Sequence, residues 1–447
     1  MSHIAGVLQL TSKTRYGMTS RNVPMYLFHP LNTQFPQMVV ASSHRDLKKN
    51  ILIVAEKIND DKIPRGQLID VIGTCGDPLA ERNAIHVAYS PTYWMKIPEM
   101  KEPCYSRPIL DVPTINIDPL GCVDIDDCIS IWTEMGTTKV AITIADVAEW
   151  VRANPWMTHA QSIGQSLYDG GMAVRNMFPK SLEGKMSLLP GEKRLGYALI
   201  FDWTNGEIVS PHFKEVTIIN KKTYTYDTCR GVAEFPLKTL IAVCEHVAGR
   251  PLFDPHEWVA ELMIFYNKQM AEELTKLGKG LLRHHSAPDV EKMDKYVTLG
   301  LNARMFAYSA ATYEHVSPGV QHWGFQSRYC HGTSPIRRWA DVVNQMAMKG
   351  MPVPEARDDC NRLQKFAKKH ARDLAFLDII QRKPEDVLGI IVSDTRVWIP
   401  DWQRMITCHN EFLEGTGVNV RYFLDMQRPT WKQRMVFHMT KTDPSVA

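Results

Sequence analysis

The chain has 447 residues, of which 44% are hydrophobic and 23% charged, a composition typical of soluble globular domains. This length allows two or three domains with sizeable cores. The formal net charge of +3 is too small for a basic nucleic-acid coat, so a polyanion site would require a local grouping of charge. No apolar run is long enough to span a membrane and residues 1–17 contain no signal-peptide core, so we expect a cytoplasmic protein.

The nine cysteines give no sign of a metal or disulfide framework. They form no C-x-x-C motif and no clusters with zinc-type spacing, and their number is odd. We therefore expect reduced thiols that mostly serve as packing residues.

The N-terminal part of the chain, residues 1–100, has the pattern of a small all-β unit. The short apolar runs MYLFHP, QMVVAS, NILIVAEKI and QLIDVIG are separated by Pro, Asn and Gly. At this length a barrel is favoured over a sandwich. The segment WMKIPEMKEPCYSRP (94–108) predicts a linker into a larger domain, residues 101–382, that starts with strands such as KVAITIADVAEWV and continues with helices.

The clearest predicted helix covers residues 254–278. Asp254 suits the N-cap, Pro255 the first helical position, Glu257 the capping-box position and Gly278 the stop. After the charged join QRKPED, residues 383–447 return to short β-type runs. The order of units is therefore a β-barrel, a large α+β domain and a short C-terminal β-barrel.

The stretch DPLGCVDIDD (118–127) contains four aspartates, with no Lys, Arg or His from position 118 to 135. At about 4 Å, two unit charges repel by roughly 1 kcal/mol in water and by several times that in a drier site. Such a cluster requires either a cation or full solvation. An EF-hand loop fails on spacing, because Val123 and Ile129 stand where it needs Gly and Glu.

The flanks of these aspartates, TINI and CISIW, have the pattern of buried strands. On a continuous strand Asp124 and Asp126 would project to one face and Asp127 to the other, with Asp118 brought near by the turn at 119–121. One interpretation is a solvated acidic turn. The other is a site for Mg²⁺, or for Mn²⁺, which suits the same oxygen ligands, with positions left for substrate phosphate.

A second stretch, CHGTSPIRRWADVVNQMAMKG (330–350), supplies positive charge. Ser334 suits an N-cap, Pro335 the first helical residue and Gly350 a stop, which predicts a helix between them. Arg337 and Arg338 would then lie in the first turn, where the helix dipole disfavours cations. Either an anion such as phosphate is held there, or both arginines pair with acidic neighbours such as Asp341.

Two tyrosines are candidates for stacking on bases, namely Tyr168 and Tyr226. The competing interpretation is that each belongs to the core or the rim of a β-rich domain.

Several of these stretches together resemble the RNB catalytic domain of the ribonuclease II/ribonuclease R family of exoribonucleases. The resemblance covers residues 105–380 and depends on motifs that occur in the order and spacing of that family: DPLGCVDIDD, ITIADVAEWV, SLYDGGMAVRNMFPKSLEGKMSLLPGEKRLGYAL, AELMIFYN, GLLRHH and CHGTSPIRRWAD. In addition, PRGQLIDVIGTCGDPLAERNAI is similar to the end of a cold-shock-type barrel. The implied fold class is multidomain α+β, an RNB domain (101–382) between an N-terminal cold-shock-like OB barrel (1–100) and a short OB-like C-terminal barrel (383–447).

The resemblance implies processive, metal-dependent hydrolysis of single-stranded RNA from the 3′ end to nucleoside 5′-monophosphates. It implies no small-molecule organic cofactor and no membrane, and a helicase or an RNA-decay assembly is a candidate protein partner. The aspartates would organise Mg²⁺ or Mn²⁺, with Asp126 usually the most critical, and Arg337 would steady the phosphate. Ser334 and Arg338 are included as RNA-binding candidates. Tyr168 aligns with an aromatic residue that stacks near the 3′ end, and Tyr226 and Glu261 align with residues that recognise the terminal 2′-hydroxyl; a shifted alignment of YTYD would select Tyr224 instead.

The chain also departs from the family pattern. Thr143 stands where many members have His, there is room for about one N-terminal barrel where many relatives carry two, and the C-terminal barrel is short and has no Lys-rich tail. These departures predict a weaker grip on RNA and poorer unwinding. The alternative function is a catalytically inactive RNB-fold protein that binds RNA or acts as a scaffold; a calcium-binding module fails on the loop spacing given above.

Overall fold

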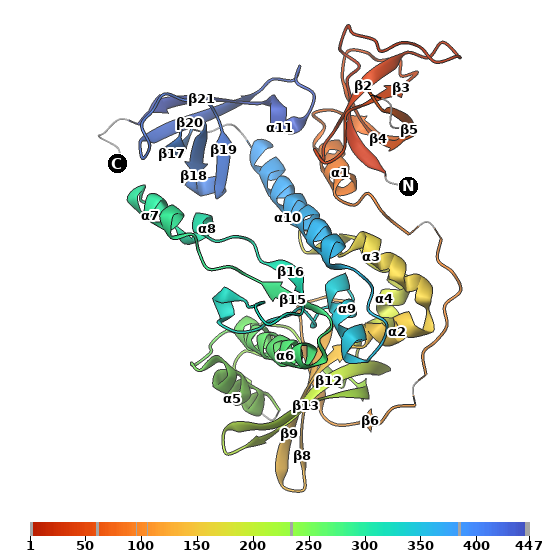
Figure 1. Cartoon of the computed structure of the whole chain (residues 1–447), viewed down its shortest axis with the longest axis vertical. Coiled ribbons are helices and arrows are strands. Elements are labelled where there is room, and N and C mark those ends of the chain that lie inside the picture. The colour runs from red at the N-terminus through yellow and green to blue at the C-terminus, as the bar shows by residue number, and fades with distance from the viewer. Residues whose placement is uncertain are drawn as a thin grey trace.

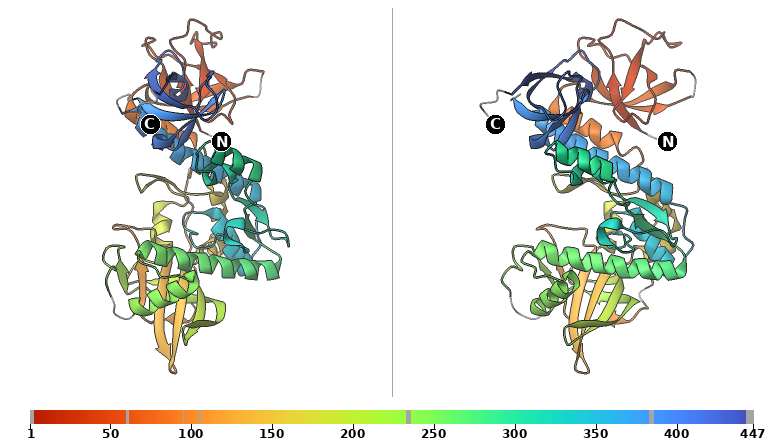
Figure 2. Two further views of the ribbon diagram at one scale, coloured as in Figure 1. Left: turned by 90° about the vertical axis from the view of Figure 1, so that its left-hand side faces the viewer. Right: turned by 60° about the vertical axis from the view of Figure 1, so that its left-hand side comes forward.

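The computed structural model describes residues 3–59, 62–94, 96–104, 106–232, 236–382 and 386–442. Two β units lie side by side at one end of the molecule, and the β8–β9 hairpin of the central sheet lies at the opposite end (Figures 1 and 2). A long helix, α10 (Arg357–Ile380), runs from the β units into the central domain. The first residue of the predicted C-terminal unit, 383, lies outside the described residues.

The N-terminal unit is a closed five-stranded barrel, as the sequence predicts, with strand order β1-β2-β3-β5-β4. Alternating residues fill its interior, including Leu8, Phe28 and Ile53. A helix that the sequence analysis did not predict, α1, follows the last strand and begins at the N-cap Asp77. The elements are β1 (Ile4–Leu8), β2 (Met25–Pro30), β3 (Met38–Ala41), β4 (Ile51–Lys57), β5 (Arg65–Thr74) and α1 (Pro78–Ala88).

The central domain is built on a seven-stranded sheet of order β14-β7-β8-β9-β12-β13-β6. The strands are β6 (Ile109–Leu110), β7 (Thr114–Ile117), β8 (Asp127–Glu134), β9 (Thr137–Ala145), β12 (Lys193–Thr204), β13 (Glu207–Ile219) and β14 (Lys222–Tyr224). Two short hairpins lie outside this sheet, β10 (Leu167–Asp169) with β11 (Met172–Arg175), and β15 (Leu281–His284) with β16 (Thr312–His315).

Helices cover both faces of this sheet, because apolar side chains of its strands project alternately to one face and the other. Ile142 and Phe201 pack against α5 and α6, whereas Ala141 and Ala198 pack against α2, α4 and α9. The helices are α2 (Val147–Ala153), α3 (Ala160–Ile163), α4 (Lys180–Met186), α5 (Leu237–Ala248), α6 (Pro255–Leu277), α7 (Val290–Thr298), α8 (Arg304–Ala307) and α9 (Trp339–Met348), with 3₁₀ turns at Pro155–His159 and Trp323–Phe325.

The predicted helix at 254–278 is confirmed as α6. Asp254 caps it in a capping box with Glu257, Pro255 is its first residue and Gly278 ends it with φ of 65°. Among the described residues no helix combines the length and the apolar character that a membrane span requires. All nine cysteines are free thiols, as predicted.

The C-terminal unit is a five-stranded sheet of order β19-β18-β17-β20-β21. The sequence predicts a barrel here, but within the described residues the two edge strands do not pair, so the unit is a curled open sheet. Its elements are β17 (Val387–Ser393), β18 (Arg396–Ile399), a 3₁₀ turn (Pro400–Trp402), β19 (Arg404–Thr407), β20 (Gly417–Leu424), α11 (Trp431–Arg434) and β21 (Met435–Lys441).

A buried ionic cluster joins the linker, α2 and the end of α9. Lys349 Nζ lies 2.5 Å from Asp146 and 2.7 Å from Glu149, and the Arg107 guanidinium lies 2.6 Å from Asp146 and 2.7 Å from Glu149. The side chains of Lys349 and Asp146 are fully buried. Both cations hold the pKa of Asp146 below its usual range despite its burial.

We predict that Lys349→Met lowers the free energy of unfolding of the central domain by about 3–5 kcal/mol, because it removes one of the two cations that pair with the buried Asp146 and leaves its charge undercompensated. The control is Lys276→Met, which removes an exposed pair with Glu273 and should leave the free energy of unfolding almost unchanged. Urea unfolding followed by intrinsic fluorescence measures both. Equal effects of the two substitutions would contradict the assignment.

Candidate active site

The aspartates lie in a loop between two adjacent antiparallel strands. Strand β7 ends at Ile117 and β8 begins at Asp127, so the strand geometry predicted for Asp124 and Asp126 is wrong, and only Asp127 of the four lies on a strand. The predicted turn at 119–121 is present, because the Cys122 N–H donates to the Pro119 carbonyl (3.1 Å). The loop curves instead of extending because its backbone is bonded to other segments: the Ile125 N–H donates to Ser187 Oγ (2.9 Å), beyond α4.

Asp126 is the most firmly held of the four carboxylates. Its side chain is buried, Oδ1 accepts the Ile336 N–H (3.0 Å) and Oδ2 lies 3.3 Å from Arg337 Nε. Burial raises the pKa of Asp126 to about 7, against the opposing effects of Arg337 and the Ile336 N–H. These two contacts join the aspartate loop to the segment 334–338, about two hundred residues away in sequence.

The carboxylates of Asp127 and Asp118 have fewer hydrogen-bond donors and cations around them than that of Asp126. Asp118 accepts the side-chain amide of Asn116 (2.8 Å), whereas Asp127 Oδ2 is buried and has no hydrogen-bond partner among the described residues. Burial raises the pKa of both groups, and the charges of Asp118 and Asp126 raise the pKa of Asp127 further. A carboxylate oxygen left unpaired beside other carboxylates is an unfavourable arrangement for the protein alone.

The fourth carboxylate, Asp124, accepts the Tyr168 hydroxyl (2.9 Å). Burial, together with the charge of Asp124, raises the pKa of Tyr168 above its usual range, so the phenol stays protonated as the donor. The structure therefore brings Tyr168, which the family resemblance aligns with a residue near the RNA 3′ end, to the aspartate loop.

The segment 334–338 is a turn and not the start of a helix, so the predicted helix start at Ser334–Pro335 is wrong. Helix α9 begins at Trp339. The turn forms because two buried carboxylates accept backbone N–H groups: Asp341 takes that of Ser334 (2.7 Å) and Asp126 that of Ile336. Arg337 and Arg338 therefore precede the helix, and the helix dipole gives no reason to expect an anion beside them.

The two arginines have different partners. Arg338 pairs with the buried Asp341 (2.8 Å), which was one of the two alternatives drawn from the sequence. Arg337 pairs with Asp126 and donates to Ser334 Oγ (3.1 Å), and half of its side chain is exposed. Arg337 therefore has a free surface beside the aspartates, whereas Ser334 is buried and supports Arg337.

Of the residues aligned with 2′-hydroxyl recognition, Tyr226 lies near the aspartates. Burial, followed by the charges of Asp118 and Asp127, raises the pKa of Tyr226 to about 12. Its ring stacks on His256 at 3.5 Å between centroids. The alternative residue Tyr224 is buried in the sheet core as part of β14, so the structure favours Tyr226.

Glu261 is not brought to this group. Its carboxylate lies 3.5 Å from Arg250, and it lines a surface hollow with Ile208 and His246. His256 and Glu261 lie five positions apart on α6 and therefore project about 140° from each other. The α6 face that carries His256 contacts Tyr226, and Glu261 faces α5.

Two residues near the site, Glu183 and His256, were not predicted from the sequence. Glu183 is buried on α4 and accepts the Asn176 side chain; burial raises its pKa to about 7, and the charge of Asp124 acts in the same direction. The sequence feature that could have identified Glu183 is its position within the long motif that begins SLYDGG. His256 carried no signal, because its role depends on a ring contact with a distant residue.

The residues fit a hard divalent cation. The donor set consists of carboxylate oxygens, which Mg²⁺ and Mn²⁺ prefer, and the unpaired Asp127 Oδ2 is the group that a cation would satisfy. A second carboxylate trio, Asp146, Glu149 and Glu215, has ligand atoms within 4.8 Å of one another. Three cations, Arg107, Arg152 and Lys349, already pair with these three carboxylates, so the trio does not need an ion.

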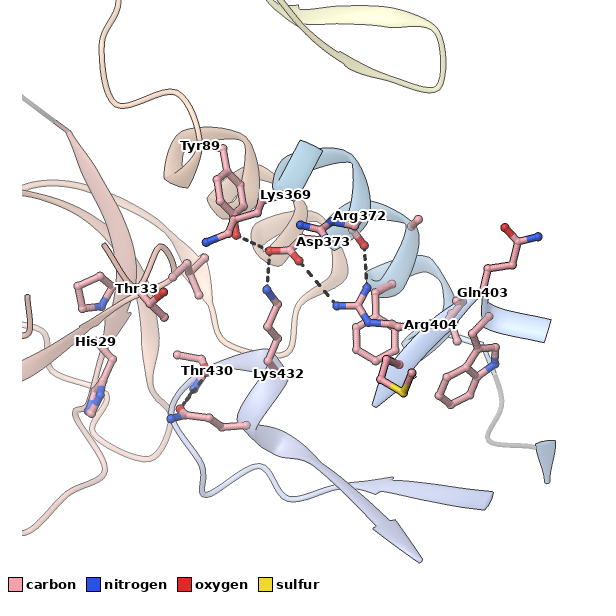
Figure 3. Close-up of a pocket in the computed structure, with 18 of the residues that line it drawn as sticks. His29, Thr33, Tyr89, Lys369, Arg372, Asp373, Gln403, Arg404, Thr430 and Lys432 are labelled. Atoms are coloured by element: carbon pink, nitrogen blue, oxygen red, sulfur yellow. Dashed lines mark hydrogen bonds and ion pairs between the residues drawn. The ribbon is translucent and has the colours of Figure 1, made fainter. Parts of the chain in front are cut away.

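A large groove lies between the N-terminal barrel, α10 and the C-terminal sheet (Figure 3). Its volume is about 990 Å³, and none of its lining residues belongs to the aspartate site. The lining combines aromatic and cationic side chains, namely Tyr89, Phe376, Trp398, Trp402, Lys369, Arg372, Arg396, Arg404 and Lys432. At its centre Asp373 accepts the Tyr89 hydroxyl (2.6 Å) and pairs with Lys432 (2.7 Å), while the other lysines and arginines leave the groove positive.

Comparison with known proteins agrees with this architecture. The family model of the RNB domain matches residues 107–235. The chain is 22% identical to the probable exosome complex exonuclease RRP44 of Caenorhabditis elegans over 76% of this chain and 46% of that protein. It is 30% identical to ribonuclease R of Mycoplasma genitalium over 29% of this chain and 18% of that protein. The chain thus spans less than half the length of the curated relatives it matches.

Solved structures share the fold. Mycoplasma genitalium RNase R in complex with ribose-methylated single-stranded RNA superposes with a TM-score of 0.71 at 16% identity, over 98% of this chain and 90% of that one. Yeast Ssd1, a pseudonuclease, superposes with a TM-score of 0.71 at 17% identity, over 94% of this chain and 68% of that one. Residues 107–235 therefore match the RNB domain, and the chain shares the multidomain α+β fold of RNase R; these findings confirm the resemblance to the ribonuclease II/ribonuclease R family.

We predict that Asp127→Asn stabilises the protein in the absence of divalent cations by about 0.5–2 kcal/mol, because it removes an uncompensated buried charge. The raised pKa of Asp127 sets the sign: a carboxyl protonated more readily in the folded state destabilises that state as pH rises above its ordinary range near 4. The stability gap between variant and wild type should therefore open from pH 4 upward.

Thermal melts in EDTA across pH 4–8 measure this gap. Asp202→Asn, which removes a surface partner of Lys139, is the control and should show little change. A melting temperature of Asp127→Asn below that of wild type at neutral pH would contradict the prediction.

Proposed function

We propose that this protein is a metal-dependent exoribonuclease that hydrolyses single-stranded RNA processively from its 3′ end to nucleoside 5′-monophosphates. The observation that carries the proposal is the site itself: a half-exposed Arg337 lies against Asp126, beside a buried Asp127 oxygen without a partner. The direction of degradation rests on relatives, which include an exosome exonuclease and a human 3′-5′ exoribonuclease, HELZ2, 29% identical over 27% of this chain.

Asp118, Asp124, Asp126 and Asp127 would hold the divalent cations, Mg²⁺ or Mn²⁺. When bound, such ions lower the pKa of water and stabilise the attacking and leaving oxygens of a phosphodiester. The protein contributes rigidity to this site, because the Ile336 N–H fixes Asp126 and the Tyr168 hydroxyl fixes Asp124.

Arg337 stabilises the charge that builds up on the scissile phosphate. Its contacts with Asp126 and Ser334 define its orientation, and the exposed half of the guanidinium remains available to phosphate oxygens. A fixed donor of this kind needs no reorganisation during the reaction. Arg338, held by Asp341, is assigned a supporting role in the same segment.

RNA reaches the site from the groove of Figure 3. The lysines and arginines of the groove, with the partly exposed Trp402, suit a single strand, because phosphates pair with Lys and Arg and bases stack without sequence preference. Tyr168 is the stacking residue proposed for the 3′ end. The relative named as an exosome exonuclease makes an RNA-decay assembly the protein partner to test.

A pseudonuclease that binds RNA without cleaving it is the second candidate, because yeast Ssd1 has an equally similar fold. The presence of all four aspartates and Arg337, in contact through Asp126, favours catalysis. The two candidates differ in one measurable property, the release of nucleotides.

We predict that Asp126→Asn reduces nucleotide release at least about 100-fold and leaves RNA binding in EDTA intact, because the charge that orders Arg337 and a cation is lost while size is kept. Product lengths from a 5′-labelled single-stranded RNA, with Mg²⁺ or with EDTA, measure release, and Asp202→Asn is the control. Intact RNA with the wild-type protein would favour the pseudonuclease.

We predict that Tyr226→Phe lowers the preference for RNA over DNA by about two- to ten-fold. This factor corresponds to the loss of one hydrogen bond between the tyrosine hydroxyl and the ribose 2′-hydroxyl, the group that distinguishes RNA from DNA. Rates on RNA and DNA oligomers of one sequence measure the preference. The matched control is Tyr224→Phe, two residues away and buried. A larger effect of Tyr224→Phe, or none from Tyr226→Phe, would reject the assignment.

A further inference from the structure

The hairpin β10–β11, which carries Tyr168, is an isolated pair of strands that belongs to no larger sheet. Such a pair is marginally stable by itself. Its turn, Gly170–Gly171, has φ of 57° and 84°, and Met172 at its outer end is 74% exposed. Neighbouring elements must therefore hold this hairpin in place if Tyr168 is to reach Asp124.

The inner end of the hairpin is tied to the active-site turn. The Ser166 N–H donates to the Arg337 carbonyl (3.0 Å), and Leu167 is buried against residues of α1 and α10. These contacts position the start of β10. They do not by themselves determine where the next two residues, Tyr168 and Asp169, point.

The residue after Tyr168 supplies such an interaction. Successive strand residues project to opposite faces, so Tyr168 faces the aspartates while Asp169 faces α1. There the Arg82 guanidinium makes a two-pronged contact with Asp169, Nε to Oδ2 at 2.6 Å and Nη2 to Oδ1 at 2.7 Å. His86, one turn further along α1, places Nε2 3.3 Å from Asp169 Oδ2.

Helix α1 is itself fixed to α10 by the same side chains. Arg82 Nη1 lies 2.6 Å from Asp378, and His86 Nδ1 lies 2.9 Å from His370 Nε2. The Asp169 and Arg82 side chains are 16% and 28% exposed, so their charged, bidentate contact is only partly weakened by solvent. Arg82 holds the pKa of Asp169 below its usual range, which keeps the carboxylate ionised.

We propose that Asp169, through its ion pair with Arg82, is a positioning residue that holds the Tyr168 hydroxyl in contact with Asp124. Helix α1, which follows the N-terminal barrel, thereby orders the active site. The effect on catalysis rests on the proposed nuclease function. The effect on the position of Tyr168 does not, and the experiment separates the two.

The test compares Asp169→Asn with Asp378→Asn. Both substitutions remove one carboxylate from Arg82, but the first frees the hairpin while the second leaves the Arg82–Asp169 contact in place. A ¹⁹F probe, 3-fluorotyrosine at position 168, reports whether the hydroxyl still lies against Asp124, and Asp124→Asn calibrates the loss of that contact. Arg82→Lys, which keeps the charge but removes the two-pronged geometry, is the second variant if Asp169→Asn folds poorly.

We expect Asp169→Asn to move the ¹⁹F signal toward that of Asp124→Asn and to lower kcat for nucleotide release by about 10- to 100-fold, while KM for long RNA changes little. Adding Tyr168→Phe should then cost little more, because the hydroxyl is already displaced. Asp378→Asn should change neither readout.

The proposal is overturned if the ¹⁹F signal of Asp169→Asn matches that of wild type, or if Asp378→Asn moves the signal as far as Asp169→Asn does. If Asp169→Asn moves the signal and the wild-type protein releases no nucleotide, the positioning role stands and the nuclease function fails.

Discussion

The contact of Asp126 with residues 336 and 337 is the interaction on which the site depends. One carboxylate accepts the Ile336 N–H and pairs with Arg337, and so joins two loops that belong to different halves of the central domain. The seven-stranded sheet supplies the first loop at the β7–β8 connection, and the chain entering α9 supplies the second. Because Asp126 is buried, the pair is protected from solvent on the side of the carboxylate, while Arg337 remains open on the other.

The molecule contains two dense groups of carboxylates, which differ in how many cations pair with them. The group whose charges are paired has a structural role, and the group whose charges are not fully paired is the candidate active site. Around Asp146, the three cations Arg107, Arg152 and Lys349 match the three carboxylates, and the group holds the linker against α2 and α9. In the aspartate loop, Arg337 is the cation in contact with the carboxylates and Asp127 keeps an oxygen without a partner among the described residues. This imbalance leaves the aspartate loop short of positive charge, which a bound cation would supply.

Local signals in the sequence predicted local structure well. The capping box at Asp254 and the stop at Gly278 depend on neighbouring residues alone, and both were confirmed. The helix start at Ser334 failed because Asp341 and Asp126 bind the backbone N–H groups of the turn, and Asp126 lies about two hundred residues away. For the same reason the sequence identified the four aspartates and Arg337 as candidates but not their pairing. The sequence alone did not exclude Glu261, whose carboxylate pairs with Arg250 in the structure. Nor did it reveal Arg82 and Asp169, which come into contact only when α1 packs against the β10–β11 hairpin.

Anomalous scattering from crystals soaked in Mn²⁺ tests the central claim most directly, because it locates the ion without requiring turnover. The account predicts an anomalous peak among Asp118, Asp124, Asp126 and Asp127, and no peak at the neutralised trio of Asp146, Glu149 and Glu215. A peak at the trio, or an aspartate loop without metal at concentrations that saturate binding, would contradict it.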